Sequence, residues 1–287
     1  KPDGSKYNIN TDGLKIHTTI NYKMQVYAED AINQHMPRLQ KEFFKQNKIE
    51  DNPTAPFREL TEGAIDTLLR RAMKRSERWR KMKYDLKKDN DEIEESFFVP
   101  KEMTVFSWQG EIDTIMTPLD SMKYYKSFFR PGMMSMDPTN GYIKAWVGGM
   151  NYRHFQYDMV KKGKRQIGST FKPFVYAAAI DQLKLSPCDT FPDSQFCIEK
   201  NKFGNVEQWC PKNSGDRYGR TRTLKNALAN SVNTVTARLM DRIGPRTVVK
   251  LAKDLGIEQR ILPVPSIALG TPDLSVYEMV AAYSTFA

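Results

Sequence analysis

The stretch from Gln166 to Ile180 constrains the fold of this chain more than any other. It runs Gln-Ile-Gly-Ser-Thr-Phe-Lys-Pro-Phe and continues into an apolar, alanine-rich segment, which predicts a buried helix. Pro173 is compatible with that helix only in its first turn, where backbone amides still lack partners. Ser169 is therefore expected at or near the start of the helix, with Lys172 over the same face.

A hydroxyl beside an amine at a half-buried helix end is the arrangement that a Ser-Lys acyl-transfer enzyme needs. An amine kept neutral by burial can accept the hydroxyl proton, and the helix N-terminus with the Ser169 backbone N–H favours an oxyanion. A Ser-x-x-Lys tetrapeptide is a weak signal by itself, because a capping serine followed by an exposed lysine gives the same pattern. Ser169 and Lys172 therefore need a second signal.

Ser231-Val232-Asn233 supplies that second signal, at a polar break between two apolar helical segments. A hydroxyl and an amide two residues apart in a tight turn can both face one cleft. We expect Ser231 to relay a proton and Asn233 to bind a substrate amide. The alternative is that these residues only cap the following helix.

These motifs and their flanks resemble the transpeptidase region of class A, bifunctional penicillin-binding proteins. Ser169-Thr-Phe-Lys172 and Ser231-Val-Asn233 are similar to the first two of three motifs shared by serine penicillin-binding proteins and serine β-lactamases. The likeness extends over residues 13–46 and 133–287, whereas residues 50–100 match nothing recognised. The flanking sequences that point to class A are residues 13–21, 136–149, 168–174, 224–233 and 268–283.

The resemblance implies an α+β fold of the penicillin-binding-protein and serine β-lactamase type, with an antiparallel sheet packed by helices and incomplete at its C-terminus. It also implies a peptidoglycan D,D-transpeptidase acting on stem peptides that end in D-Ala-D-Ala. Ser169 is then the nucleophile, Lys172 the general base, Ser231 the proton shuttle and Asn233 the ligand of the donor-peptide amide. No cofactor and no metal is implied, and β-lactams are expected to acylate Ser169.

One family feature is missing from the sequence: the third motif, Lys-Thr-Gly, does not occur between Lys1 and Ala287. Because that motif supplies an oxyanion N–H and a carboxylate-binding cation, we expect these residues alone to be a poor catalyst. The family's glycosyltransferase domain and N-terminal membrane anchor are also absent, as expected for a piece of a longer periplasmic protein anchored to the cytoplasmic membrane. Other cell-wall synthesis proteins are further expected partners.

Two other classes of function share these motifs. One is a hydrolase, either a D,D-carboxypeptidase or a β-lactamase. The other is an inactive transpeptidase-like scaffold that binds cell-wall components. The long segment before Ser169 and the class A flanks favour the transpeptidase over a lone β-lactamase.

Positive charge is concentrated in one part of the chain. The formal net charge is +10, and residues 70–88 hold ten basic side chains against two acidic ones. We predict a solvated basic helix face and no nucleic-acid binding, because no nucleic-acid module surrounds it. The chain is expected to divide into a linker strand and helix (1–50), a basic helical accessory lobe plus hairpin (51–130), and a transpeptidase core (131–287).

The local pattern predicts most of the elements. Alternating apolar residues predict a strand over 14–20, followed by a helix from about residue 22 that Pro37 kinks or ends. Two hairpins are predicted, and the second is expected to support the Ser169 helix. Their strands are 103–108 with 111–116 and 133–137 with 142–147, and further helices are predicted at 117–129, 224–229, 235–243, 247–255 and 275–286.

The cysteines lie close together in the sequence. Cys188, Cys197 and Cys210 have no accompanying histidine cluster, so a zinc site is not predicted. Cys197 and Cys210 flank a turn signal at 202–205 and can face each other across a hairpin. In an oxidising compartment we expect these two to pair and Cys188 to stay free; three buried thiols are the equal alternative.

Overall fold

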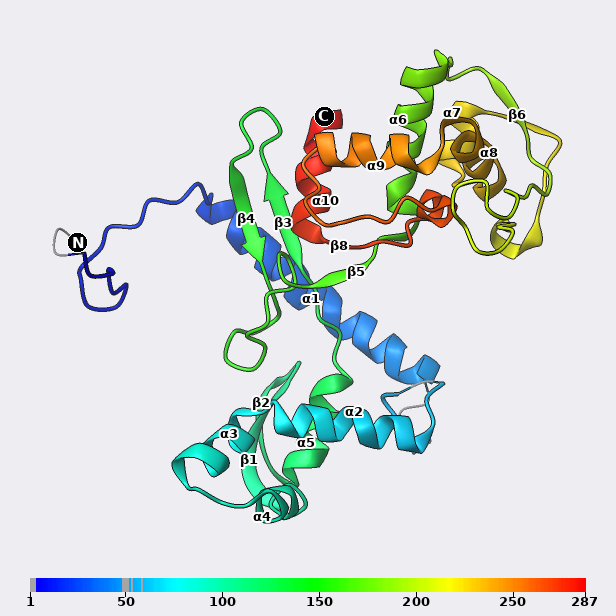
Figure 1. Cartoon of the computed structure of the whole chain (residues 1–287). Helices are drawn as coiled ribbons and strands as arrows, with labels where there is room; N and C mark the ends of the chain where they lie inside the picture. Colours follow the sequence, from blue (N-terminus) through cyan, green and yellow to red (C-terminus); the bar gives the residue numbers. More distant parts are fainter. Residues whose placement is uncertain (1–3, 48–51, 53, 58) are drawn as a thin grey trace. The chain divides into compact units, whose positions relative to one another are not determined.

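The computed structural model describes residues 4–47, 52, 54–57 and 59–287 (Figure 1). The chain forms two compact units, and the boundary between them falls inside the first helix. The first unit takes in the chain through Gln25, Gly132–Gly148 and Tyr157–Ala287, and the second takes in Val26–Pro131 and Gly149–Gln156. Helices and antiparallel strands make up both units, as the predicted α+β class requires.

The core of the first unit is a group of helices around α6 (Lys172–Leu183). This helix packs against α8 (Asn233–Ile243) and α9 (Pro245–Asp254), which lie beside it in Figure 1. Its side chains Phe174, Val175, Ala178 and Ala179 are buried in one core cluster with aliphatic side chains of those helices. Burial of this apolar surface fixes α6 in place, because each fully buried large side chain contributes about 1.5–3 kcal/mol.

Short strands of the first unit pair in antiparallel twos. The predicted second hairpin is present as β3 (Met133–Met136) and β4 (Ile143–Val147). We expected this hairpin to support the Ser169 helix; instead it is α10 (Val276–Tyr283) that packs on β3, while α6 is surrounded mainly by other helices. The prediction failed because α6 is apolar on most sides, which suits a helical core.

The remaining elements of this unit are short. Two more antiparallel pairs join β5 with β8 and β6 with β7. Their bounds, with the short helices, are β5 (Lys164–Gln166), η2 (Gly168–Phe171), β6 (Thr190–Pro192), η3 (Ser214–Asp216), β7 (Thr221–Thr223), α7 (Leu224–Ala229), η4 (Pro265–Leu269), β8 (Asp273–Ser275) and η5 (Ser284–Phe286).

The second unit contains the first predicted hairpin and the basic helical segment. The hairpin strands β1 and β2 join at Ser107 and Gly110, and Thr117 caps the helix that follows by accepting a hydrogen bond from the Asp120 amide. Aromatic side chains of Phe106, Phe128 and Phe155 form one of its small cores. The elements are α2 (Glu62–Lys74), α3 (Glu77–Arg80), η1 (Lys81–Asp85), α4 (Asn90–Glu95), β1 (Lys101–Ser107), β2 (Gly110–Met116) and α5 (Pro118–Lys126).

The strand predicted in the N-terminal part is absent. Residues 14–20 form no strand: Leu14, Ile16 and Ile20 are exposed, and the neighbouring backbone contacts run only from Thr19 and Asn21 to Ile143 and Lys144. An alternating pattern therefore predicted a strand where no ladder partner is available.

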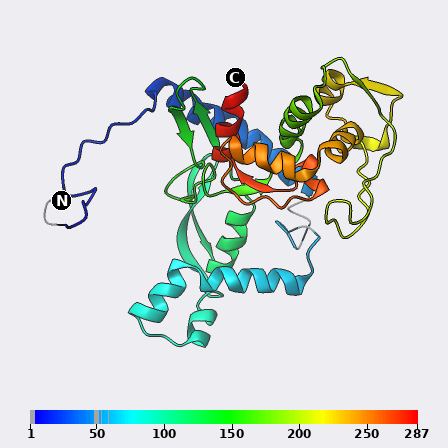
Figure 2. The same ribbon diagram turned by 45° about the horizontal axis from the view of Figure 1, so that its top comes forward.

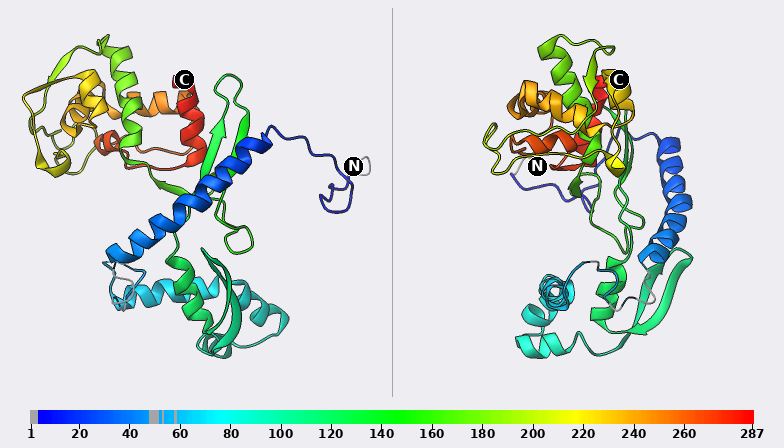
Figure 3. Two further views of the ribbon diagram at one scale, coloured as in Figure 1. Left: turned by 180° about the vertical axis from the view of Figure 1, so that it is seen from behind. Right: turned by 90° about the vertical axis from the view of Figure 1, so that its right-hand side faces the viewer.

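Pro37 does not end the first helix either. The helix α1 (Tyr22–Asn47) continues past it without a break (Figure 3). Met36 and Gln40, on either side of the proline, are both buried, and Gln40 is hydrogen-bonded to backbone at Ser127 and Phe129. These contacts offset the roughly 3 kcal/mol that an internal proline costs.

Two further findings concern the cysteines and the character of the helices. Cys197 and Cys210 are joined by a disulfide, next to an isolated strand bridge between Ile198 and Trp209, and Cys188 is a free, exposed thiol. Among the described residues, no helix combines the length and apolar character needed to cross a bilayer.

Candidate active site

The turn before α6 presents Ser169. Gly168 to Phe171 form the 3-10 helix η2, and α6 begins directly afterwards at Lys172, with Pro173 in its first turn. The hydroxyl of Ser169 is exposed, and no described residue forms a hydrogen bond with it. An unpartnered hydroxyl at the start of a buried helix is available to a ligand, and positive backbone groups lie beside it.

Lys172 is almost completely buried, with 1% of its surface exposed. Its Nζ donates hydrogen bonds to the Ser231 carbonyl oxygen at 2.6 Å, to Ser231 Oγ at 2.9 Å and to Asn233 Oδ1 at 2.5 Å. All three acceptors are formally neutral, and no carboxylate pairs with this ammonium among the described residues. Burial therefore lowers the pKa of Lys172 from 10.5 to about 8.

The Ser231 turn is built to face Lys172. Ser231 stands between α7 and α8 with a φ of +53°, a left-handed conformation that few residues other than glycine adopt. Hydrogen bonds from the Ser231 amide to Leu228 and from the Val232 amide to Ala227 hold the turn, and Val232 is buried beneath it. In this conformation the carbonyl and the hydroxyl of Ser231 both reach the same amine. Strained backbone of this kind costs about 1–3 kcal/mol and is typical of functional sites.

A buried carboxylate supports the start of α8. Asp193, 1% exposed, accepts hydrogen bonds from the Thr234 hydroxyl at 2.8 Å, the Asn213 side chain at 2.7 Å and the Gly219 amide at 2.9 Å. Arg222 Nε completes the set at 3.1 Å. Burial on its own raises the pKa of Asp193, but these hydrogen bonds outweigh it and lower the pKa below its ordinary value. The carboxylate therefore stays ionised at neutral pH.

Asn213 passes this support on to Asn233. The side-chain Oδ1 of Asn213 accepts hydrogen bonds from the backbone amides of Asn233 at 2.9 Å and Thr234 at 3.2 Å. The Asn233 side-chain amide donates to the Lys212 carbonyl at 2.7 Å, which directs its oxygen towards Lys172. Both ends of the Asn233 side chain are thus fixed. Its orientation is set before any ligand arrives.

A later segment of the chain holds the Ser169 turn from behind. The Gly168 amide donates to the Gly270 carbonyl at 2.9 Å, and the Ile167 amide donates to the Pro272 carbonyl at 3.2 Å. The two glycines touch: a Cβ on Gly270 would lie 1.8 Å from the Gly168 carbonyl oxygen. Tyr283 of α10 donates its hydroxyl to the Thr170 carbonyl at 2.5 Å. We call Gly270, Pro272 and Tyr283 the turn clamp.

Tyr176 is another titratable side chain close to Lys172 that could be considered as a base. Tyr176 lies one helical turn further along α6 and is 3% exposed. Burial raises the pKa of Tyr176 to about 12, although the Thr236 hydroxyl works against this. Tyr176 therefore keeps its proton at neutral pH, and Lys172 is the group whose pKa suits proton transfer.

Two families of known proteins match most of the chain. The family described as penicillin-binding protein middle domain matches residues 52–129, and the family described as penicillin binding protein transpeptidase domain matches residues 131–273. Together they cover about three quarters of the chain. The chain belongs to the penicillin-binding proteins. Its resemblance to class A is confirmed, because the curated relatives are penicillin-binding proteins 1A.

Two relatives and one solved structure illustrate the similarity. Penicillin-binding protein 1A of Aquifex aeolicus (strain VF5) is 35% identical over 158 residues, which are 54% of this chain and 21% of the relative. The Neisseria lactamica protein of the same name is 35% identical over 156 residues, or 54% of this chain and 19% of the relative. The structure of penicillin-binding protein 1A from Haemophilus influenzae covers 95% of this chain and 42% of its own, with a TM-score of 0.59 at 21% identity.

The identities and coverages limit what can be transferred from these proteins to this chain. This penicillin-binding protein spans about a fifth of the length of the curated relatives that it matches. The Haemophilus influenzae structure is too distant in sequence to transfer more than the fold, and that fold agrees with the predicted transpeptidase fold of mixed helices and antiparallel strands. The roles of the site residues therefore rest on the geometry of this chain itself.

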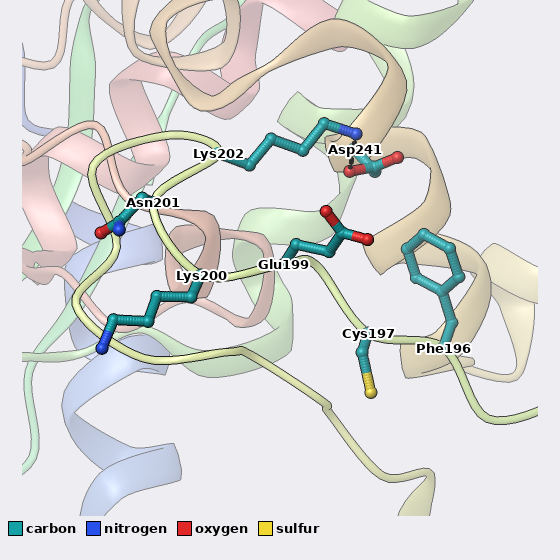
Figure 4. Close-up of a pocket in the computed structure, with 7 residues that line it drawn as sticks. All are labelled: Phe196, Cys197, Glu199, Lys200, Asn201, Lys202 and Asp241. Atoms are coloured by element: carbon teal, nitrogen blue, oxygen red, sulfur yellow. Dashed lines mark hydrogen bonds and ion pairs between the residues drawn. The ribbon is translucent and has the colours of Figure 1, made fainter.

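A separate hollow in this penicillin-binding protein lies along the disulfide loop (Figure 4). It has a volume of about 560 Å³ and is lined by Phe196, Cys197, residues 199–202 and Asp241. Lys202 reaches across it to form an ion pair with Asp241 at 2.6 Å, and Glu199 points the same way. No group of side chains that could hold a metal ion occurs among the described residues. This hollow shares no residue with the Lys172 site.

Sequence reasoning found the residues around Lys172 but missed those that hold them. The structure brings Lys172, Ser231 and Asn233 into direct contact and places Ser169 in the turn just before Lys172. Asp193 and Asn213 carried no recognised signal. The turn clamp lies in the class A flank 268–283, but no role was predicted for its residues. Gly270 offered a local hint, since a glycine between two short apolar segments often marks a positive φ or a close backbone approach.

Proposed function

We propose that this protein is the peptidoglycan D,D-transpeptidase part of a class A penicillin-binding protein, with Ser169 as its nucleophile. The observation that carries the proposal is the buried Lys172 amine. It has a pKa of about 8, touches Ser231 and Asn233, and follows Ser169 by one turn. The middle-domain and transpeptidase-domain matches support the same conclusion.

The acylation step uses these groups in sequence. The neutral Lys172 amine takes the proton of the Ser169 hydroxyl, and the oxygen attacks the carbonyl carbon of the penultimate D-Ala of a stem peptide. The Ser169 backbone N–H and the positive helix start stabilise the oxyanion. Ser231 passes a proton from Lys172 to the leaving nitrogen, so the peptide bond breaks and free D-Ala departs. Asn233 holds the donor-peptide amide while this happens.

Deacylation reverses the proton movements. The amine of a neighbouring stem peptide attacks the Ser169 ester and gives up a proton, which Ser231 passes to the neutral Lys172 amine. The ester C–O bond breaks as the new peptide bond forms, and Lys172 returns that proton to the departing Ser169 oxygen. β-Lactams mimic the D-Ala-D-Ala end and acylate the same oxygen. The site needs no cofactor for either step, because the side chains named here account for every proton.

The setting of the protein is part of the proposal. We place it on the outer side of the cytoplasmic membrane, in the periplasm, attached through an anchor in the full-length protein. The Cys197–Cys210 disulfide supports an oxidising compartment. We assign residues 51–130 to an accessory lobe and residues 131–287 to the transpeptidase core. Other cell-wall synthesis proteins are proposed partners.

The test is covalent labelling of the full-length protein. A fluorescent penicillin should label the wild type and a Ser135→Ala control equally and should leave Ser169→Ala unlabelled, with the adduct mapped to the Ser169 peptide by mass spectrometry. Label retained in Ser169→Ala contradicts the nucleophile assignment and favours a scaffold. Supplying a stem peptide with and without an amine acceptor separates cross-linking from hydrolysis, the outcome expected of a carboxypeptidase or β-lactamase.

A further inference from the structure

The second unit contains a basic groove that the proposed reaction does not use. The groove has a volume of about 1100 Å³ and is lined by residues of α2 and by residues at and after the end of α5. These two helices pack against each other (Figures 1 and 2). Four of its nine lining residues are cations and none is acidic. They are Arg71, Arg75, Lys126 and Arg130.

These cations are not neutralised within the described chain. The nearby Arg70, which does not line the groove, takes both Asp66 and Glu94 as partners. Arg71, Arg75 and Lys126, by contrast, form no ion pair with any described carboxylate, so the groove carries uncompensated charge. Four like charges around one concave surface repel one another, and an anionic ligand relieves that repulsion.

Two contacts hold the Arg130 side chain in place. Its guanidinium lies over the Phe155 ring at 4.6 Å and donates a hydrogen bond to the Tyr125 carbonyl at 3.3 Å. Partial burial lowers the pKa of Arg130, yet the guanidinium remains charged at any physiological pH. One wall of the groove therefore has a fixed cation, which reduces the entropy lost on binding.

The floor of the groove is a narrow apolar stripe. Ala64, Leu68 and Ala72 recur every four residues along one face of α2 and span about 12 Å. Small side chains at this spacing let another helix approach closely. Arg71 and Arg75, four residues apart at the end of α2, line the groove beside this stripe. Lys126, the last residue of α5, and Arg130, in the non-helical segment after it, also line the groove.

We propose that this groove docks an acidic amphipathic helix of a partner protein. Such a helix would place a narrow apolar stripe on the α2 stripe, with an Asp or Glu pair at i and i+4 on one flank to meet Arg71 and Arg75, and further acidic side chains on the other flank to meet Lys126 and Arg130. The charge and the four-residue spacing of the groove are complementary to that pattern.

Two other anionic ligands fit the groove less well. Contact with an anionic membrane surface normally adds protruding aromatic or large apolar side chains, and none of the lining residues is aromatic. The same absence argues against single-stranded nucleic acid, which stacks its bases on aromatic rings. A concave surface with a recessed apolar stripe instead suits a helix laid into a groove.

The test uses a designed peptide as the probe. A fluorescent helix-forming peptide of about 18 residues, long enough to span the groove, carries Ala and Leu on one stripe and Glu pairs on both flanks. We expect binding to the purified protein with a dissociation constant in the micromolar range, about what a small groove supports, and weaker binding at high salt. A scrambled peptide of identical composition should bind at least roughly tenfold more weakly.

Matched protein variants locate the binding. Arg71→Glu/Arg75→Glu should weaken peptide binding by roughly tenfold or more. Arg80→Glu/Lys87→Glu changes the net charge equally, outside the groove, and should stay within about twofold of the wild type. Circular dichroism checks the fold; should the reversed pair not fold, Arg71→Gln/Arg75→Gln decides, with an expected loss of about threefold or more.

Three outcomes would overturn the proposal. Equal binding of the scrambled peptide means non-specific attraction, and an equal loss in the Arg80/Lys87 variant means that the groove is not the site. The third is binding to phosphatidylglycerol vesicles that depends on Arg71 and Arg75 while the helical peptide does not bind. That result assigns the groove to lipid phosphate rather than to a protein.

Discussion

The contact between Gly168 and Gly270 leads to a sharp prediction about the nucleophile. In Gly270→Ala the new Cβ would lie 1.8 Å from the Gly168 carbonyl oxygen, 2.4 Å from its carbonyl carbon and 2.6 Å from its nitrogen. All three atoms are backbone, so no flexible side chain can move aside. The Gly168–Ser169 turn must shift by roughly 1 Å or more before the atoms reach an ordinary contact distance.

A shift of that size should be visible in the chemistry. Misplacing a reacting group by 1 Å costs about a hundredfold in rate, so we expect Gly270→Ala to acylate about a hundred times more slowly than the wild type. Some of the damage is conformational, because Gly270 has a φ of +72° and alanine pays roughly 1–2 kcal/mol there. That part lowers the melting temperature without moving the nucleophile.

Gly256→Ala separates the two effects. Gly256 also has a positive φ, +93°, but a Cβ at that position meets nothing within 4 Å. The assay is the rate of fluorescent-penicillin labelling of the full-length protein at one temperature, well below the melting point of each variant. We expect Gly256→Ala to lose stability but to acylate at close to the wild-type rate. Normal acylation by Gly270→Ala, or an equal loss in Gly256→Ala, would refute the role of the close glycine contact.

Three further predictions concern the groups around Lys172. Because burial lowers the pKa of Lys172 to about 8, about a tenth of the amine is neutral at pH 7, and the acylation rate should rise with pH to a plateau with a midpoint near 8; a flat profile from pH 6 to 9 would contradict its role as base. Between pH 8 and 10.5 the unfolded chain holds a Lys172 proton that the folded protein releases, so the free energy of unfolding should rise with pH across that range, by up to about 3 kcal/mol, and Lys172→Met should abolish this rise in chemical denaturation. Asp193→Asn should lower the free energy of unfolding by roughly 2–4 kcal/mol in urea denaturation, because a neutral amide leaves buried hydrogen-bond donors without a matching acceptor. Because the folded protein lowers the pKa of Asp193, the stability difference between wild type and variant should be full above the ordinary carboxyl pKa and should be lost as the pH falls through the lower folded pKa. The control is Asp181→Asn, the same change at an exposed position.

Sequence reasoning reached the local elements whose signals are chemical. The helices predicted at 117–129 and 224–229 are present, and Thr117 and Thr223 cap them by accepting a backbone hydrogen bond. Both hairpins are present because their turns carry strong turn residues. Pro173 correctly placed the start of the Ser169 helix, since a proline is excluded from the helix interior.

What failed depended on partners far away in the chain. The exposed segment 14–20 has the composition of a strand, but a strand exists only with a neighbour. The position of α1 around Pro37 is decided by buried contacts such as Gln40, which a local propensity cannot include. The same limit applies to the site residues. Motif residues can be recognised in the sequence by their type and spacing, whereas the roles of Asp193 and Gly270 depend on the residues that the fold places against them.

The contacts that organise Ser169 also set when the site can exist. Lys172 meets its hydrogen-bond partners 59 and 61 residues later, and Thr170 meets Tyr283 after 113 residues. Such long loops close slowly, and a ribosome delivers the N-terminal side first. A growing chain in which Ser169 has already been synthesised therefore has an unreactive Ser169 hydroxyl until α10 has also been synthesised. Synthesis order alone would keep unfinished copies from reacting with substrates or antibiotics.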